Sequence, residues 1–191
     1  MLLNGLKNYL EENSEWKVSR TFTKAEECLS ALAAITNEED FPKIIIVDVQ
    51  LQGESGFDLV EKITKEYPFS KCLIYSMYDT PGYILQAKES GAKGYLSKVA
   101  GEDELLAALK TVSAGGEYIE KRMEKTIEKL DSVISVFSKQ EKIIFEKILQ
   151  GKTNKQIAEE LFISPHSVEN YVSFIYDKAG VKNRAELIQK F

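Results

Sequence analysis

The sequence predicts an α/β domain with a parallel sheet, followed by a smaller all-α domain. Up to about residue 114, helical patterns alternate with short β-rich runs, which is typical of α/β architecture. After Phe137 the apolar spacing is purely helical. The charge changes at the same place: residues 1–136 hold 16 Lys and Arg against 23 Asp and Glu, whereas residues 137–191 hold 9 against 7. A mildly basic second part suggests a domain that contacts nucleic acid.

The composition restricts the class of protein. A chain of 191 residues suits one large domain or two modest ones, and 43 % hydrophobic residues argue against extensive disorder. The two cysteines, Cys28 and Cys72, are too few for a disulfide scaffold and lack metal-ligand spacing, so we expect a cytoplasmic protein. No apolar run approaches the roughly 20 residues of a membrane helix. Since no cofactor loop or catalytic triad is visible, we do not expect an enzyme.

The first part of the chain opens on a helix, expected over Leu2–Glu12, because Leu3, Leu6 and Leu10 recur at helical spacing. One alternating strand, two buried strands and one short strand are then expected at 17–22, 43–48, 71–76 and 94–97. Helices are expected between and after them at 24–37, 56–66, 80–90 and 102–114. Residues 120–136 form a charged helix or linker, which gives domains of 1–119 and 137–191 on either side of it.

The second part contains two short helices joined by a tight turn. Thr153 and Gln156 form a capping box that starts a helix carrying Ile157, Ala158 and Leu161. Ser164 and Pro165 start the next helix, whose apolar stripe ends at Gly180. Asn183 and Glu186 form a capping box for a last helix. This pattern fits a helix-turn-helix, although periodicity alone fits an ordinary helical hairpin equally well.

Three polar residues follow strand ends in the α/β part: Asp48, Ser76 and Lys98. The carboxyl ends of parallel strands meet at one edge of the sheet, where such folds place their chemistry. A carboxylate, a hydroxyl and a lysine together suit phosphoryl transfer to the carboxylate. Taken singly, each residue is also an ordinary turn or surface residue.

The wider sequence around these residues resembles a known family. The runs 44–48, 55–56, 73–77 and 91–98 are similar to the receiver domain of bacterial two-component response regulators, with NarL/FixJ-like spacing, over residues 1–119. The resemblance implies that Asp48 is the phosphoacceptor, Ser76 the switch hydroxyl and Lys98 the phosphate partner. It also implies that Tyr95 is an aromatic switch, for which the alternative is a half-buried strand residue. The implied fold is flavodoxin-like, and the implied partner is a sensor histidine kinase.

The chain departs from this family at its start. Receivers begin with a central strand ending in an acidic pair, which holds Mg²⁺ together with the phosphoacceptor and a backbone carbonyl, here that of Gln50. In this chain Leu2–Leu10 already matches the first helix. We therefore expect that the reading frame extends upstream. In the chain as given, we expect an incomplete magnesium site at Asp48 and Gln50 and, as a result, little phosphate uptake. Residues 17–22 would lack a partner unless they pair with 43–48 or another chain lends a strand.

Residues 137–191 resemble the LuxR/NarL-type DNA-binding domain, through the runs 137–141, 151–158, 161–164, 167–170 and 180–184. This resemblance implies a transcription factor that binds DNA as a homodimer paired through its last helix, on palindromic sites. The outer face of the second helix is expected to read bases through four residues: His166, Glu169, Asn170 and Ser173. Phosphate contacts are expected from Lys152, Lys155, Lys178, Lys182 and Arg184.

We therefore interpret the chain as a response regulator whose receiver, phosphorylated on Asp48, gates a DNA-binding domain. The alternative is a degenerate, phosphorylation-independent receiver that acts as a protein-interaction module with weak or no DNA binding.

Overall fold

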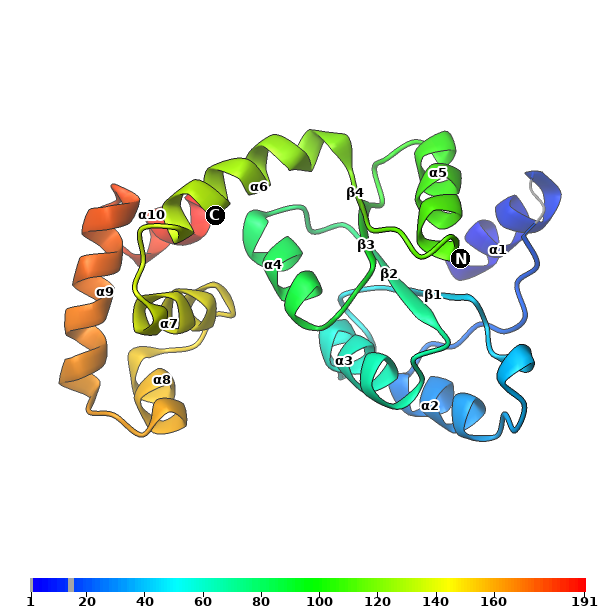
Figure 1. Ribbon diagram of the computed structural model, residues 1–191, viewed down its shortest axis with the longest axis horizontal. Helices are drawn as coiled ribbons and strands as arrows, with labels where there is room; N and C mark the ends of the chain where they lie inside the picture. Colours follow the sequence, from blue (N-terminus) through cyan, green and yellow to red (C-terminus); the bar gives the residue numbers. More distant parts are fainter. Residues whose placement is uncertain (1, 14–15) are drawn as a thin grey trace. The chain divides into compact units, whose positions relative to one another are not determined.

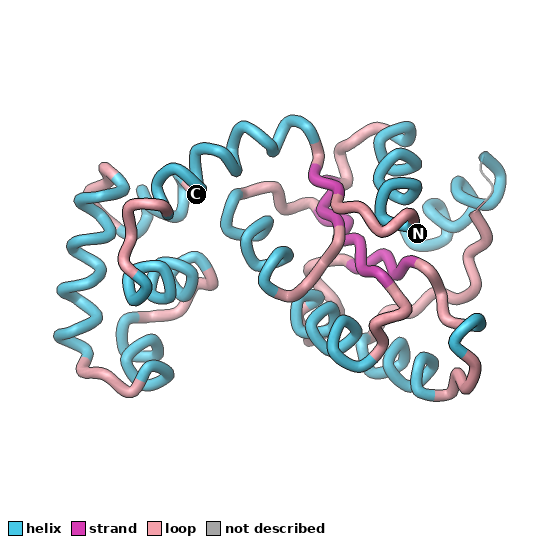
Figure 2. The backbone as a smooth tube through the Cα atoms, in the orientation of Figure 1, coloured by secondary structure: helices cyan, strands magenta, loops and turns pink. Residues whose placement is uncertain are grey.

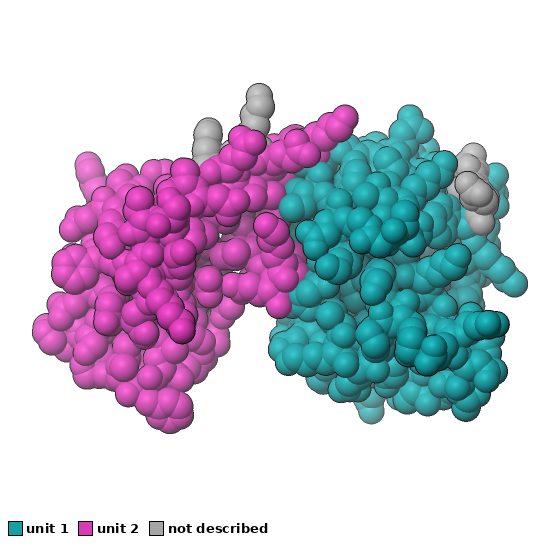
Figure 3. Space-filling view, viewed as in Figure 1, with its two compact units in different colours: residues 1–77, 90–120 teal, residues 78–89, 121–191 magenta. Residues whose placement is uncertain are grey.

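The computed structural model describes residues 2–13 and 16–191, and the chain divides into two compact units (Figure 3). Unit 1 comprises residues 1–77 and 90–120, and unit 2 comprises residues 78–89 and 121–191. The segment 78–89, which the sequence places within the α/β part, thus clusters with the C-terminal helices. Each unit has its own core and is described by itself.

A parallel sheet forms the centre of unit 1 (Figure 1). Its strands lie in the order β1 (Ile44–Val47), β2 (Lys71–Ser76), β3 (Gly94–Ser97) and β4 (Tyr118–Ile119). The register pairs Val47 with Ile74, and Ser76 with Ser97. The strands expected at 43–48, 71–76 and 94–97 are confirmed. Strand β4 was not predicted, because two residues carry no readable alternation.

The strand expected over Lys17–Phe22 is wrong. Within the described chain, this segment enters no ladder, and Figure 2 draws the described part of the connection between the first two helices as loop. Its alternation is also incomplete: Val18 and Phe22 are half-buried and Lys17 is exposed, but Arg20, which would share a strand face with Val18 and Phe22, is exposed too. A strand needs a hydrogen-bonding neighbour, and β1, the nearest candidate, pairs only with β2 among the described residues.

Helices cover both faces of the sheet. On one face, α1 (Leu2–Asn13) and α5 (Glu102–Ser113) share a core with Leu73 and Leu96 of the strands. On the other, α3 (Gly56–Glu66) packs on β2, and α2 (Ala25–Ala33) packs on α3 (Figure 1). A short 3₁₀ helix, η1 (Glu38–Asp40), precedes β1. Cys28 and Cys72 are buried free thiols, and burial raises the pKa of Cys72 to about 12.

Unit 2 consists of helices. They are α4 (Pro81–Glu89), α6 (Lys121–Ile134), α7 (Lys139–Leu149), α8 (Asn154–Leu161), α9 (Pro165–Ala179) and α10 (Arg184–Lys190). At the centre, the Phe145 ring meets Phe137 and Phe191 edge-on, with centroids 5.2 and 5.6 Å apart. Leu85 of α4 packs against this core, and the Gly82 N–H donates to the Phe191 carbonyl at 2.6 Å. Helix α4 is thereby fixed to the end of the chain.

Local sequence signals set the helix ends of unit 2. The capping box of Thr153 and Gln156 is confirmed, and Ser164 caps α9 with Pro165 at its first position. Gly180 ends α9 in the left-handed conformation, at φ +64°. The box at α10 differs from the prediction. The Asn183 side chain accepts from the Glu186 N–H, but the Glu186 carboxylate accepts from the backbone N–H of Lys182 and from the side-chain amide of Asn183, where a capping box uses the backbone N–H of residue 183.

Candidate functional site

Asp48 and Lys98 meet at the carboxyl edge of the sheet. The Lys98 ammonium donates to Oδ2 of Asp48, which follows β1 directly. The Lys98 side chain is 14 % exposed and that of Asp48 is 34 % exposed, so the carboxylate is held by a cation but stays accessible. The Lys98 backbone N–H also donates to the Ser76 carbonyl at 2.8 Å. The structure thus gathers the three strand-end residues at one edge, with the Ser76 side chain fully buried.

Gly56 fixes the backbone beneath this carboxylate. Its N–H donates to the Val49 carbonyl at 2.8 Å, and Ser55 caps helix α3 through the Phe57 N–H. A Cβ atom on Gly56 would lie 2.0 Å from the Asp48 carbonyl oxygen, which is far inside van der Waals contact. The position therefore requires glycine. The sequence shows a glycine eight residues after Asp48, but only the packing of α3 explains it.

Two further residues of unit 1 are buried near the strand ends. Tyr95 is 1 % exposed within β3, so the expected half-buried alternative does not describe its environment. Glu120 is 3 % exposed, and its Oε2 accepts from the Ser97 N–H at 3.0 Å. Sequence reasoning missed Glu120, because the residue follows a strand too short to predict. Its carboxylate ties the last strand to the residue just before Lys98.

The residues present do not make up a magnesium site. Magnesium requires octahedral oxygen ligation, usually with one or two carboxylates besides phosphate and water. Asp48 offers one carboxylate, which the Lys98 ammonium already contacts, and Gln50 offers a backbone carbonyl on an exposed residue. In the described part of the chain, no three His, Cys, Asp or Glu side chains gather to hold a metal. The Asp79 carboxylate, which belongs to unit 2, forms an ion pair there, since its Oδ2 lies 3.2 Å from Nη2 of Arg122 in α6.

In unit 2, helix α9 presents a polar outer face opposite the apolar stripe. Val168, Val172 and Ile175 are buried on the inner side. The four residues expected to read bases are all exposed on the outer side, at positions 166, 169, 170 and 173. Nδ1 of His166 lies 3.7 Å from Oε2 of Glu169. The face is thus free of packing within unit 2, as a base-reading helix requires.

Two exposed aromatic residues lie in α9 and in the turn before it, and sequence reasoning did not single them out. Phe162, in the turn between α8 and α9, is 95 % exposed and has φ +55°. Phe174, on α9, is 56 % exposed. A signal was available for Phe162, since an apolar residue at the tight turn lies outside both apolar stripes.

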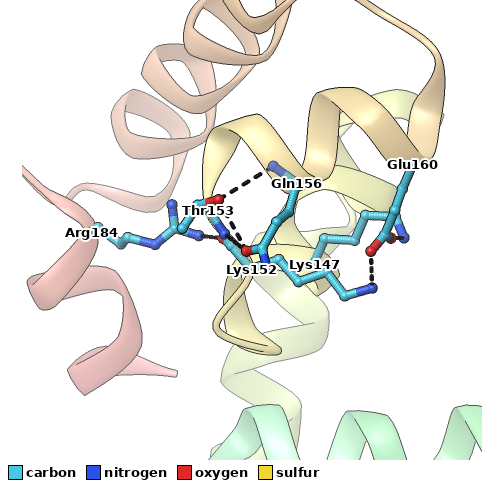
Figure 4. A network of polar contacts seen from close by, with 6 residues as sticks. All are labelled: Lys147, Lys152, Thr153, Gln156, Glu160 and Arg184. Atoms are coloured by element: carbon cyan, nitrogen blue, oxygen red, sulfur yellow. Dashed lines mark hydrogen bonds and ion pairs between the residues drawn. The ribbon is translucent and has the colours of Figure 1, made fainter.

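Several of the expected phosphate-binding cations make contacts within unit 2 (Figure 4). Glu160 accepts from Lys147 and from Lys152, each at 2.5 Å, and these bonds lower the pKa of Glu160. Arg184 donates to the Lys152 carbonyl and, at 3.1 Å, to Oδ1 of Asn154. These contacts join α7, α8 and α10. Lys152 and Arg184, which the sequence predicts as phosphate contacts, therefore hold these helices together.

Lys178 is committed to a different partner. Its ammonium donates to both carboxylate oxygens of Glu141, at 2.8 and 2.7 Å. Glu141, whose side chain is 6 % exposed, also accepts from the Ser138 N–H as part of the capping box of α7. The Lys178 contact holds the pKa of Glu141 below its usual range. Lys155 and Lys182 are exposed as well.

Comparisons with known proteins agree on the class of both parts. Residues 1–110 match the family model "Response regulator receiver domain", and residues 135–191 match "Bacterial regulatory proteins, luxR family". The Oxygen regulatory protein NreC of Staphylococcus carnosus is 33 % identical over 161 residues, which are 78 % of this chain and 74 % of that protein. NreC of Staphylococcus haemolyticus is 34 % identical over 164 residues, or 79 % and 76 %.

The fold also has solved counterparts. A structure of two RcsB dimers bound to two parallel DNAs has a TM-score of 0.68 at 18 % identity and covers 99 % of this chain and 91 % of its own. The response regulator ChrA of a heme-sensing two-component system has a TM-score of 0.51 at 28 % identity, with 98 % and 89 % covered. None of the helices in the described ranges is long and apolar enough to cross a membrane.

Proposed function

The chain belongs to the two-component response regulators that join a receiver domain to a LuxR-type DNA-binding domain, and we propose that Asp48 is the phosphoacceptor that controls DNA binding by residues 137–191. The observation that carries this proposal is the Asp48–Lys98 pair at the carboxyl edge of the sheet. Nothing in the comparisons favours the alternative of a degenerate interaction module.

The geometry suits transfer of a phosphoryl group from a phosphohistidine of a sensor kinase. A carboxylate oxygen of Asp48 attacks the phosphorus, the phosphorus–nitrogen bond breaks, and the imidazole of the kinase leaves. Lys98 then exchanges a carboxylate oxygen for the phosphoryl oxygens, which carry more negative charge. The Ser76 hydroxyl, buried at the neighbouring strand end, donates to the phosphoryl group. Receiver domains generally use Mg²⁺ for this reaction, and the incomplete donor set of this chain leads us to expect slow uptake.

Phosphate labelling tests the role of Asp48. The full chain is incubated with a small phosphodonor and magnesium, and intact and peptide masses are measured. We expect label at low stoichiometry on Asp48 alone, lost in Asp48→Asn and kept in Asp58→Asn, a matched change at an exposed carboxylate of α3. Label on another residue, or no label after long incubation, would contradict the assignment.

We propose that α9 reads base edges and that Lys155 contacts a DNA phosphate. Asn170 lies on the exposed face of α9, and an asparagine can bond adenine bidentately. The solved RcsB dimers bind DNA, which supports DNA as the ligand and a homodimer as the binding form. The exposed Ile188 of α10 supplies an apolar contact for such a dimer. From this role we infer a cytoplasmic location and no enzymatic turnover.

Binding to duplexes tests these roles separately. A preferred site is first selected from random DNA with the full chain, and affinities are then measured at several salt concentrations. Asn170→Ala should lose about 1–3 kcal/mol at the preferred site only. Lys155→Ala should weaken all sequences and flatten the salt slope by about one unit, whereas Lys139→Ala, a change at the exposed start of α7, should leave the slope unchanged. Glu169→Lys should strengthen non-specific binding. Absence of binding to any DNA at low salt would contradict the proposal.

A further inference from the structure

Phe174 is an apolar exception on the polar outer face of helix α9. The helix carries three aromatic residues, and two of them, Tyr171 and Tyr176, pack against the core of unit 2. Phe174 is 56 % exposed and, within the described chain, is not part of that core. A side chain of this size stabilises a fold through its burial. Phe174 therefore contributes little to the fold of unit 2.

The position of Phe174 continues the row of residues that we propose to read bases. Phe174 follows Asn170 by four residues, as Asn170 follows His166, and side chains four positions apart stand one above another on a helix. All three side chains are exposed. The helices α7, α8 and α10 pack against α9 on its buried side (Figure 1). Phe174 thus extends the outer face by one turn toward the C-terminal end of α9.

The charge of this outer face does not suit guanine. Guanine presents two acceptors in the major groove, which arginine or lysine bonds bidentately. Lys178 is the one Lys or Arg of α9, and its ammonium is held by the carboxylate of Glu141. Glu169 and Asp177, both exposed, carry carboxylates that only accept hydrogen bonds when ionised. The bases that suit this face are therefore those that offer a donor or an apolar group.

Thymine offers the apolar group, because its C5 methyl lies in the major groove, where a phenylalanine can contact it. The ring of Phe174 has neither a donor nor an acceptor, so this methyl is the feature of a base edge that it matches. A helix rises about 1.5 Å per residue and base pairs are about 3.4 Å apart, so Phe174 lies about 6 Å, or about two base pairs, beyond Asn170.

We propose that Phe174 is a specificity-determining residue, which recognises the methyl group of a thymine about two base pairs from the adenine bonded by Asn170. This inference rests on the proposed function, in which α9 reads base edges. It adds the base that the exposed phenylalanine selects. It also makes the preferred sequence rich in A·T pairs at the positions that α9 faces.

Replacement of thymine by deoxyuridine tests the contact, because deoxyuridine pairs with adenine in the same way and lacks only the methyl group. The full chain is bound to its selected site, and the thymines of that site are replaced one at a time. We expect one thymine in each half-site at which the replacement weakens binding about fourfold, which corresponds to the roughly 0.8 kcal/mol that burial of one methyl group contributes. Replacement of the other thymines should leave the affinity unchanged.

Variants of the chain assign this methyl group to its partner. Phe174→Ala should lose about tenfold in affinity for the selected site and should bind the thymine and deoxyuridine duplexes equally, because the ring no longer covers the methyl group. Phe174→Leu, which keeps an apolar side chain, should retain part of the discrimination. Phe69→Ala truncates a comparably exposed phenylalanine of unit 1 and should keep the full difference. Alanine favours a helix more than phenylalanine does, and circular dichroism checks that the fold is retained.

Three results would overturn the inference. The first is a selected site at which no deoxyuridine replacement weakens binding. The second is discrimination that persists in Phe174→Ala or that is also lost in Phe69→Ala. The third is a Phe174→Ala variant that binds all sequences more weakly by the same factor, which would assign the ring to the sugar–phosphate backbone.

Asn170→Ala separates this inference from the proposed function. If that variant loses discrimination at its adenine while no thymine responds to the loss of its methyl group, α9 remains the reading helix and Phe174 does not read a base. Binding to no DNA at low salt would contradict both.

Discussion

A change at Lys178 tests whether this lysine stabilises the fold of unit 2 or contacts DNA. From the sequence we predict that this residue contacts a DNA phosphate, whereas in the structure its ammonium donates to the carboxylate of Glu141. The change Lys178→Met removes the charge and keeps an apolar stem. If the structural contact dominates, the variant loses stability in unit 2.

The magnitude follows from the burial of the two partners. Breaking a fully buried pair costs about 3–5 kcal/mol, because one charge stays buried without its partner, and a hydrogen bond to a charged group contributes about 1.5–3 kcal/mol. The Glu141 side chain is 6 % exposed, but that of Lys178 is 38 % exposed, so water reaches one side of the contact. The Ser138 N–H still stabilises the carboxylate. We therefore expect a loss of about 2 kcal/mol in the free energy of unfolding of unit 2.

Hydrogen exchange read by mass spectrometry measures this loss locally, in peptides from α7 and α9. Trp16 fluorescence during urea unfolding reports on unit 1 in the same sample, and its midpoint should not change. The double variant Glu141→Gln with Lys178→Met removes both charges and should recover most of the loss. A change of less than about 0.5 kcal/mol in Lys178→Met would refute the reasoning and return Lys178 to the DNA surface.

The pH dependence of this variant has a defined sign. Lys178 lowers the pKa of Glu141 in the folded chain, so the contact stabilises the protein above the ordinary glutamate pKa of about 4.3 and this stabilisation is lost as pH falls. The difference between the original chain and Lys178→Met should therefore be largest near pH 7 and should shrink below about pH 4. A difference that is constant with pH would exclude the charge of Glu141 as its cause.

Three further predictions concern other sites. Phe162→Gly should raise the stability of unit 2 by about 0.5–1 kcal/mol, because φ +55° costs a side chain more than it costs glycine; hydrogen exchange in α8 measures it. Gly56→Ala should destabilise unit 1 by about 2 kcal/mol or more, since its Cβ meets the Asp48 carbonyl, and Trp16 fluorescence in urea measures it. Partial desolvation and the Glu146 carboxylate raise the pKa of Glu89 to about 7, so the α4–α7 contact should weaken as pH rises from the ordinary glutamate pKa of about 4.3 to 7, whereas Glu89→Gln should keep α4 protected from exchange at pH 8.

Each of these has a control and a contradicting outcome. Gly5→Ala adds the same methyl group in helix α1 where no atom lies within 4 Å, and it should not destabilise the chain. A stable Gly56→Ala variant, or a Phe162→Gly variant that loses stability, would contradict the backbone arguments. Exchange of α4 that does not change between pH 5 and pH 8, after correction for the intrinsic rate, would contradict the raised pKa of Glu89.

The sequence by itself determined the features that depend on neighbours along the chain. The capping box of Thr153, the start of α9 at Pro165 and its end at Gly180 were all predictable, because each rests on contacts within a few residues. The buried strands were predictable from their apolar runs, and the positions of Asp48 and Lys98 followed from the rule that parallel strands end at one edge.

The tertiary structure decided what depends on distant partners. The alternation of Lys17–Phe22 suggests a strand, but a ladder needs a second backbone, and the structure leaves a cavity between this segment and β1. Likewise, composition cannot distinguish a lysine free to bind phosphate from one paired with a carboxylate 37 positions away, as Lys178 is with Glu141. Periodicity records which face of an element is apolar; only the fold brings the residue that completes a ladder or an ion pair into contact.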